Sequence, residues 1–393
     1  MSRSRIAFFL ISAVLVLPML MGTLLLASTR SDSKDRKDDD SFYKYLGVFS
    51  EVLGLIRQTY VDPPNMDALM AGALSGTTDA LDPFSLYVPA SAVEGYERAH
   101  AIGRRNSGMA LLEERGIAYV VAVEKGSSAG LAGVKAGDIV AKLNDRTTRT
   151  MPLWEVEEIL AGKPGTKVTA EVIRLGSPVT LSFELKPFDP PPVSLDEVQG
   201  VAVLRIPTFD GDTAGQVRQA RAGGKAHGRL LVDLRGVASG DPEAAYATAQ
   251  LFASGDLGVL KSRQVDVKSY GGNAAPLFTG KLAVLIDRGT LGAAELFATT
   301  LRQKLKVQLV GERTFGYAGR QASAELSSGG RLFFTDAFYT GPDKKPLKEG
   351  LKPDVQVERT RTYLEKDVPI DELILRRGVR QLLGEQEVAK KAA

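Results

Sequence analysis

The feature that most constrains the fold is an alternation of apolar runs with helical stretches over residues 201–334. Continuous apolar strands that alternate with helices are typical of a largely parallel sheet covered on both faces. This pattern therefore predicts an α/β core. The predicted strands are Val201–Ile206, Leu230–Leu234, Leu282–Ile286, Val307–Val310 and Leu332–Phe334, and the predicted helices are Thr213–Ala222, Pro242–Ser254 and Leu291–Lys304.

Before this core, residues 104–186 predict a different kind of module. Short strands and turns follow one another there, with strands over Ile117–Val123, Ile139–Leu143, Lys167–Arg174 and Val179–Leu185 and a helix over Leu153–Ala161. The proline-rich segment 187–192 (PFDPPP) separates this module from the core as a linker. Helical spacing predicts two earlier helices, over residues 42–56 and 66–81, and a last one over residues 370–383.

The first 41 residues indicate export. Arg3 and Arg5 precede an uncharged apolar stretch, Ile6–Ser28, long enough to cross a hydrocarbon core of about 30 Å. We interpret residues 6–28 as an uncleaved transmembrane anchor. A cleaved signal peptide is the alternative, because Ala27 and Ser28 are small. Residues 29–41 are a charged linker, and the rest of the chain is expected in the periplasm or outside the cell.

Composition excludes several classes of site. Lys+Arg number 50 and Asp+Glu 47, with no clustered basic stripe, so we expect no nucleic-acid partner. The absence of cysteine removes disulfides, thiolate nucleophiles and Cys-ligated zinc. The only histidines, His100 and His227, lie in polar or glycine-rich surroundings and are interpreted as surface residues. No cofactor and no metal site are predicted.

Five motifs, in order, make the chain similar to the carboxyl-terminal processing (tail-specific) serine peptidases. They are Leu81–Tyr87 (LDPFSLY), Ser107–Leu111 with Ala129–Asp138, Leu231–Gly236 (LVDLRG), Gly311–Gly316 (GERTFG) and Glu349–Asp354 (EGLKPD). The resemblance implies a crotonase/Clp-like α/β peptidase core with an inserted PDZ domain and an N-terminal helical region. The domains it implies are helical residues 42–103, a PDZ domain at 104–186, a core at 187–357 and a C-terminal helix and tail at 358–393.

The same resemblance implies a catalytic Ser–Lys pair, and this chain departs from it. Gly292 stands at the serine position and Tyr317 at the lysine position, while Gln321 keeps the family glutamine. A glycine carries no nucleophile, and a phenol with a reference pKa near 10 is a poor general base. The family oxyanion hole is expected to survive in part as the backbone amides of Ala293 and Gly240.

Two functions follow as alternatives. The first is a non-catalytic, membrane-anchored binding protein whose PDZ loop, Gly108–Met109–Ala110–Leu111, holds the C-terminal tails of exported or unfolded proteins. Further partners would be a second copy in a homodimer or an active paralogue. The second is an active serine endopeptidase with a displaced nucleophile, such as Thr290 or Ser239.

Overall fold

The computed structural model describes residues 42–114, 116–124, 126–222, 228–358 and 368–384. It divides into two compact units, Met1–Ala73 and Leu74–Ala393. Within the described residues, no helix has the length and apolar character needed to cross a membrane. The predicted anchor, residues 6–28, and its linker lie outside the described residues.

The first unit is helical, as predicted. A helix spans residues 42–59, and helix α2 (Met66–Asp79) begins in this unit and continues into the second. Asn65 caps α2, because its side-chain oxygen accepts a hydrogen bond of 3.1 Å from the backbone N–H of Ala68. The helix ends before the Asp82–Pro83 turn, as expected for a residue that precedes proline.

A six-stranded sheet forms the centre of the second unit, in the order β17-β14-β13-β10-β9-β8. All its pairs are parallel except β8 with β9, which confirms the predicted α/β core. Its strands are β8 (Ser194–Val198), β9 (Val201–Arg205), β10 (Arg229–Asp233), β13 (Lys281–Ile286), β14 (Gln308–Gly311) and β17 (Val355–Gln356).

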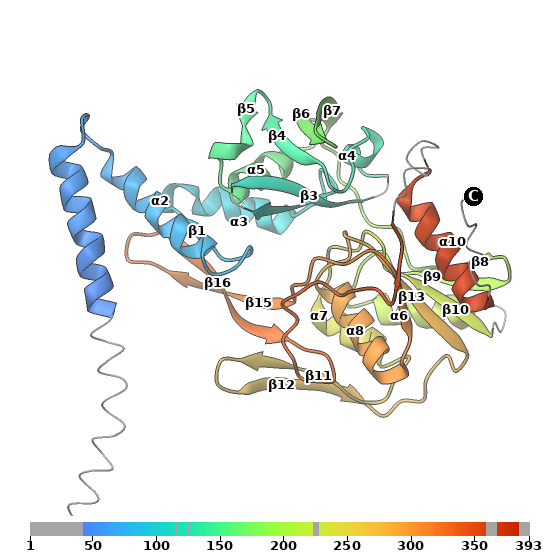
Figure 1. Ribbon diagram of the computed structural model, residues 1–393. Helices are drawn as coiled ribbons and strands as arrows, with labels where there is room; N and C mark the ends of the chain where they lie inside the picture. Colours follow the sequence, from blue (N-terminus) through green and yellow to red (C-terminus); the bar gives the residue numbers. More distant parts are fainter. Residues whose placement is uncertain (1–41, 115, 125, 223–227, 359–367, 385–393) are drawn as a thin grey trace, which may run out of the picture. The chain divides into compact units, whose positions relative to one another are not determined.

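Helices cover both faces of this sheet (Figure 1). Helix α10 (Ile370–Leu383) packs on the face that carries Val203, Leu231 and Leu285. Helices α6 (Thr213–Ala222), α7 (Pro242–Ala249) and α8 (Ala293–Leu305) pack on the opposite face. Apolar residues on both faces of each central strand explain why the strands are recognisable as continuous apolar runs.

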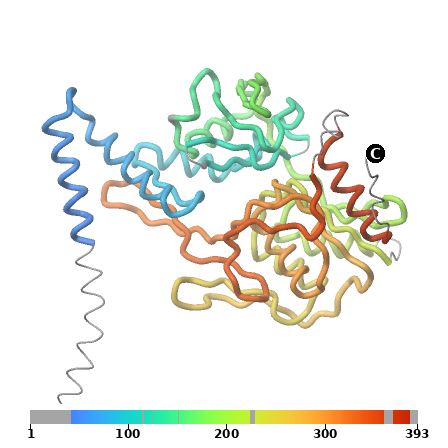
Figure 2. Tube along the Cα trace, in the orientation of Figure 1, coloured from blue at the N-terminus to red at the C-terminus, as the bar shows by residue number. Residues whose placement is uncertain are grey.

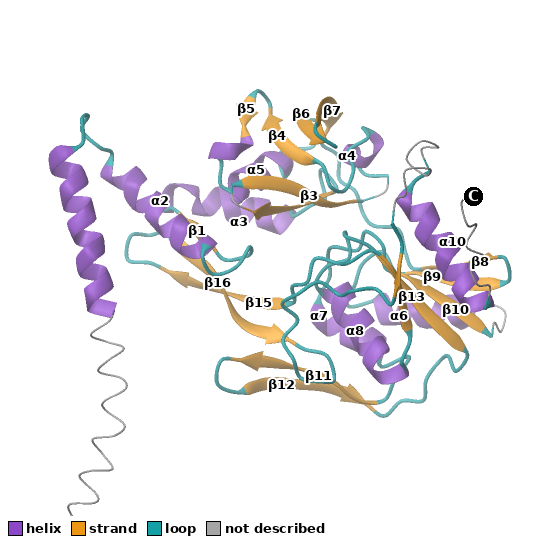
Figure 3. Ribbon diagram, viewed as in Figure 1, coloured by secondary structure: helices purple, strands orange, loops and turns teal. Residues whose placement is uncertain are grey.

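A second, antiparallel sheet lies beside the helical layer, and Figure 3 shows its strands in orange. Its order is β1-β16-β11-β12, with β15 paired to β16. The run Leu332–Phe334, which we expected in the parallel core, belongs to β16 in this sheet, because β16 pairs antiparallel with β1, β11 and β15. The strands are β1 (Leu86–Val88), β11 (Gly255–Ser262), β12 (Asp266–Gly272), β15 (Gly319–Glu325) and β16 (Arg331–Tyr339).

A third sheet forms the module inserted between β1 and β8, whose trace is green in Figure 2. Its order is β2-β3-β4-β6-β7, with β5 paired to β4. Helix α5 packs against β2, and α3, which the sequence did not reveal, packs against α5. The elements are η1 (Ala90–Ala92), α3 (Val93–Ile102), β2 (Met109–Glu114), β3 (Ile117–Val123), α4 (Ser128–Leu131), β4 (Ile139–Leu143), β5 (Arg146–Thr147), η2 (Thr148–Thr150), α5 (Leu153–Leu160), β6 (Lys167–Arg174) and β7 (Ser177–Glu184).

Candidate functional site

The site begins at the sharp turn between β13 and α8. Gly292 is the N-cap of α8 and has φ 60° and ψ −110°, a conformation that is strained for any residue with a side chain. Turns of this kind, from the end of a central strand into a helix, expose the nucleophile in other hydrolase folds. A Cβ built on Gly292 would meet only the carbonyl oxygen of Tyr317, at 3.8 Å. The turn therefore has space for a serine side chain, although its positive φ would strain any residue other than glycine.

Glu295 holds this turn from inside the protein. Its side chain is fully buried, and one carboxylate oxygen accepts hydrogen bonds from the N–H groups of Gly292 (2.9 Å) and Tyr317 (3.1 Å). The other oxygen accepts the hydroxyl proton of Thr314. Burial raises the pKa of the Glu295 carboxyl, and these hydrogen bonds partly oppose the increase. One carboxylate thus joins the start of α8 to the 314–317 loop.

Tyr317 does not present its hydroxyl as a base. Its ring stacks on Phe84 with centroids 4.2 Å apart and meets Phe338 edge-on at 5.5 Å. The hydroxyl shares a hydrogen bond with Thr335, and burial raises the pKa of Tyr317 well above its ordinary value. The phenol is therefore neutral and engaged at physiological pH.

Gln321 is also occupied structurally. It lies on β15, and its side-chain amide donates to the backbone carbonyl of Phe84. Together with the aromatic stack, this bond fixes the segment before β1 against the β15–β16 hairpin. The structure thus brings Tyr317 and Gln321 to the same residue, Phe84.

Thr290, the nearest alternative nucleophile, is fully buried. Its hydroxyl lies 2.9 Å from the carbonyl oxygen of Leu234 and 3.0 Å from Asp287 Oδ1, and it accepts the N–H of Asp287 at 3.0 Å. Burial raises the pKa of Asp287 to about 6. These contacts make Thr290 a structural residue of the loop before Gly292.

Two loops adjoin at the predicted oxyanion position. The N–H of Leu291 donates to the carbonyl of Val237 at 2.9 Å, which ties the loop before α8 to the loop before α7. Gly240 has φ 141°, and a Cβ there would lie within 2.9 Å of Phe209. Ala293 is the first residue of α8, where N–H groups lack helical partners. That Gly240 and Ala293 act together as anion donors stays a prediction.

The predicted peptide-binding loop is shorter than expected. Gly108 has φ 77°, and a Cβ there would lie 2.0 Å from the Cβ of Ser127, so only glycine fits. Met109, Ala110 and Leu111 are not loop residues, because they begin β2 and pair with Val123, Ala122 and Val120 of β3.

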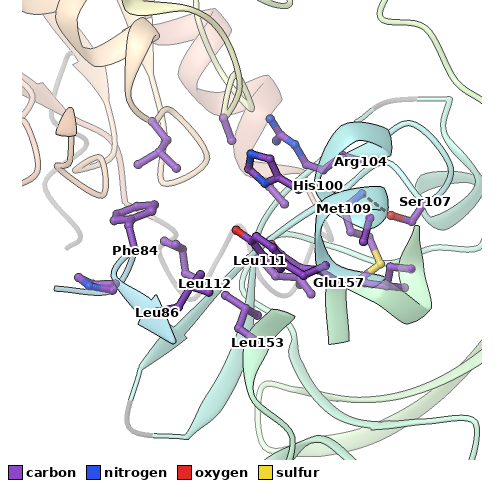
Figure 4. Close-up of a pocket in the computed structure, with 18 of the residues that line it drawn as sticks. Phe84, Leu86, His100, Arg104, Ser107, Met109, Leu111, Leu112, Leu153 and Glu157 are labelled. Carbon is purple, nitrogen blue, oxygen red and sulfur yellow. Dashed lines mark hydrogen bonds between the residues drawn. The ribbon is translucent and has the colours of Figure 1, made fainter. Parts of the chain in front are cut away.

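A pocket of about 280 Å³ lies beside this strand (Figure 4). Its walls come from β2, from α5, from α3 and the turn after it, and from the loops before α7 and α8. Residues that line it include Phe84, His100, Arg104, Glu157, Ala238, Leu291 and Gln321, together with Met109, Ala110 and Leu111. The pocket thus reaches from the PDZ strand to the residue that precedes Gly292.

The sequence did not reveal two polar residues of this pocket, Arg104 and Glu157. Glu157 lies one helical turn after Leu153 on α5, and that spacing was the available signal. His100 is exposed, as predicted, and it also lines this pocket and stacks on Tyr96 with ring centroids 5.5 Å apart. His227 lies outside the described residues. Among the described residues, no cluster of three acidic, histidine or cysteine side chains could hold a metal ion.

Comparison with known proteins gives consistent matches. Residues 200–357 match peptidase family S41, and residues 119–174 match a PDZ domain. The chain is 28% identical over 377 residues to the carboxy-terminal processing protease CtpA of Bacillus subtilis (strain 168). The aligned residues cover 91% of this chain and 78% of that protein.

A probable CtpA-like serine protease of Staphylococcus aureus (strain MRSA252) is 25% identical over 323 residues, which cover 80% of this chain and 65% of that protein. The solved photosystem II D1 C-terminal processing protease has the same fold, with a TM-score of 0.66 and 24% identity over 85% of this chain and 91% of that one. The predicted fold, an α/β peptidase core with an inserted PDZ domain and an N-terminal helical region, is confirmed.

The contacts of Glu295 generate a stability prediction. Glu295→Ala leaves three buried donors without their acceptor, so we expect the free energy of unfolding to fall by about 3–4 kcal/mol. Glu295→Gln keeps a carbonyl oxygen for the two N–H groups and should cost about 1 kcal/mol. Urea denaturation measures both variants. Equal losses in the two would show that the hydrogen bonds of Glu295 do not hold the turn.

Proposed function

Because the chain belongs to the S41 family of C-terminal processing serine peptidases and carries a PDZ domain, we propose that it is a non-catalytic member that binds protein C-termini. The observation that carries this proposal is Gly292. The turn that would present a nucleophile keeps its strained conformation but has no hydroxyl, and the residue at the base position is a buried, neutral phenol.

The loss concerns both members of a catalytic pair. A serine hydroxyl becomes nucleophilic when a base removes its proton. A lysine can act as this base when burial lowers the pKa of its amine. Loss of nucleophile and base together removes about 10⁶ in kcat from a serine peptidase. Without catalysis, the family activity left to this chain is the binding of peptides, and the pocket beside β2 supports that activity.

An active peptidase with a displaced nucleophile is the alternative, and the contacts of Thr290 weigh against it. A hydroxyl that is fully buried and bonded to Leu234 and Asp287 can attack a peptide only if the turn unfolds. Ser239 lies half-buried in the loop before α7, and no cation occupies the position of Tyr317 to activate either residue.

The binding role suits an exported protein. Arg3 and Arg5 ahead of the apolar stretch Ile6–Ser28 support an anchor in the inner membrane, with the soluble part in the periplasm or outside the cell. Partners in that compartment would be the tails of exported or unfolded proteins, a second copy of the chain or an active paralogue.

The catalytic claim is tested with a serine-directed fluorophosphonate. The wild type and the single variants Gly292→Ser and Tyr317→Lys should not label, because an unactivated serine and a lysine without its serine lack their partners. The double variant should label weakly, since a Cβ at Gly292 meets no atom closer than 3.8 Å. Wild-type labelling that survives Gly292→Ala and disappears in Thr290→Ala would establish the displaced nucleophile instead.

The location is tested by topology. Protease added to bacterial spheroplasts that express the full chain should digest the region after Ser41, because the basic residues before Ile6 favour a cytoplasmic N-terminus. A cytoplasmic marker protein in the same cells should stay intact. Equal protection of the chain and the marker would contradict export.

A further inference from the structure

The pocket beside β2 contains a cation with an unsatisfied hydrogen-bond donor. Arg104 follows α3, and among the described residues its buried Nη1 atom has no hydrogen-bond partner. Glu124 and Glu157 lie within electrostatic reach of the guanidinium, yet among the described residues no ion pair of 4 Å or less joins Arg104 to either carboxylate. A buried donor without an acceptor is costly and is expected to gain from an incoming anion.

A carboxylate shares the same pocket. Glu157 projects from α5 and lines the pocket with Arg104 (Figure 4). Desolvation raises the pKa of Glu157 to about 7, although the charge of Arg104 opposes the increase. Near neutral pH, Glu157 therefore exchanges its proton readily. Burial lowers the pKa of Arg104, but a guanidinium keeps its charge in this range.

The size of the pocket favours the end of a chain. Its volume of about 280 Å³ is near the lower limit of small-molecule pockets, which measure about 300–1,000 Å³. The apolar side chains of Met109, Leu111 and Leu160 line it beside the charged groups. An apolar terminal residue with its carboxylate combines both requirements.

We propose that Arg104 binds the terminal carboxylate of a peptide in this pocket and that Glu157 takes up a proton when the peptide binds. The inference rests on the proposed tail-binding function and adds a pH dependence to it. A second anion beside Glu157 disfavours its ionised form, so the occupied pocket holds the proton more tightly than the empty one.

Because the occupied pocket holds the proton of Glu157 more tightly, the affinity for the peptide should rise as the pH falls. Above about pH 7 the empty pocket contains an ionised Glu157, and binding must also take a proton from solvent, so affinity is low. As the pH falls below 7, Glu157 is already protonated and affinity approaches its maximum. A peptide carboxyl has a reference pKa of about 3.5 and remains charged down to pH 5.5.

Other titratable groups line the pocket or lie within electrostatic reach of Arg104. Tyr96 on α3 has a pKa raised to about 12 by burial and stays neutral throughout this range. Glu124, after β3, has a raised pKa because of burial and acts in the same direction as Glu157. His100 on α3 also lines the pocket. The test therefore includes a variant of His100, which separates its contribution to the pH dependence from that of Glu157.

The test is fluorescence anisotropy with the full-length protein in mild detergent. The probe is a labelled heptapeptide ending in valine, as the free acid and as the amide, between pH 5.5 and 8.5. Wild type should bind the free acid about tenfold more tightly at pH 5.5 than at pH 8.5. The amide should bind at least tenfold more weakly than the acid at pH 5.5, with little pH dependence.

Four variants assign the effect. Glu157→Gln should bind the free acid tightly at every pH, and Arg104→Gln should lose the preference for the acid over the amide. His100→Gln should keep the pH dependence, and so should the matched control Glu158→Gln, which changes the next residue of α5 outside this pocket. Circular dichroism of each variant verifies that it is folded.

The outcomes separate the inference from the function on which it rests. If wild type prefers the free acid but shows no pH dependence, or if Glu157→Gln keeps that dependence, the proton-linked role of Glu157 is wrong and tail binding stands. The role is also wrong if His100→Gln or Glu158→Gln removes the dependence. If acid and amide bind equally, or neither binds, the proposed tail-binding function itself fails.

Discussion

The buried carboxylate of Glu295 is the interaction on which the site depends. It accepts hydrogen bonds from Gly292, Thr314 and Tyr317, so it couples the start of α8 to the loop that follows β14. None of these bonds requires a nucleophile or a base. The backbone geometry of the turn therefore depends on a buried residue behind it and not on the side chains at positions 292 and 317.

The two substitutions also fit their surroundings physically. A glycine at φ 60° and ψ −110° avoids a backbone strain of about 1–3 kcal/mol that a serine would impose. Tyr317 fills the space between Phe84 and Phe338 with an aromatic ring and satisfies its hydroxyl on Thr335. Both residues thus favour the stability of the site.

Much of the core was predictable from the sequence, because buried parallel strands are continuous apolar runs. The predicted strands at 201–206, 230–234 and 282–286 coincide with β9, β10 and β13 to within one residue at each end. Helix α8 begins at Ala293 rather than Leu291, because Gly292 has a positive φ that is incompatible with a right-handed helix. Helix α7 ends at Ala249, before the predicted Ser254, and residues 250–252 form turns. Strand β16 was assigned to the wrong sheet, since an apolar run does not specify its partners.

The site was predictable only where a motif marks it. Gly292, Tyr317 and Gln321 are visible in the sequence, but the partners of Thr290 and of Glu295 come from loops far apart along the chain. Arg104 and Glu157 are far apart along the chain and line one pocket only because α3 and α5 pack together. Helix α3 itself was missed because only Tyr96 and Ala99 of its ten residues are buried, which is too few for an apolar period.

The central claim is that this fold binds without cutting, and counting peptide bonds broken tests it most directly. An unfolded protein incubated with the purified wild type at high enzyme concentration can be analysed for new termini by mass spectrometry. The account predicts no new termini beyond those formed in the same incubation without the protein. New termini that accumulate above that level with wild type, in proportion to time and protein concentration, would contradict it.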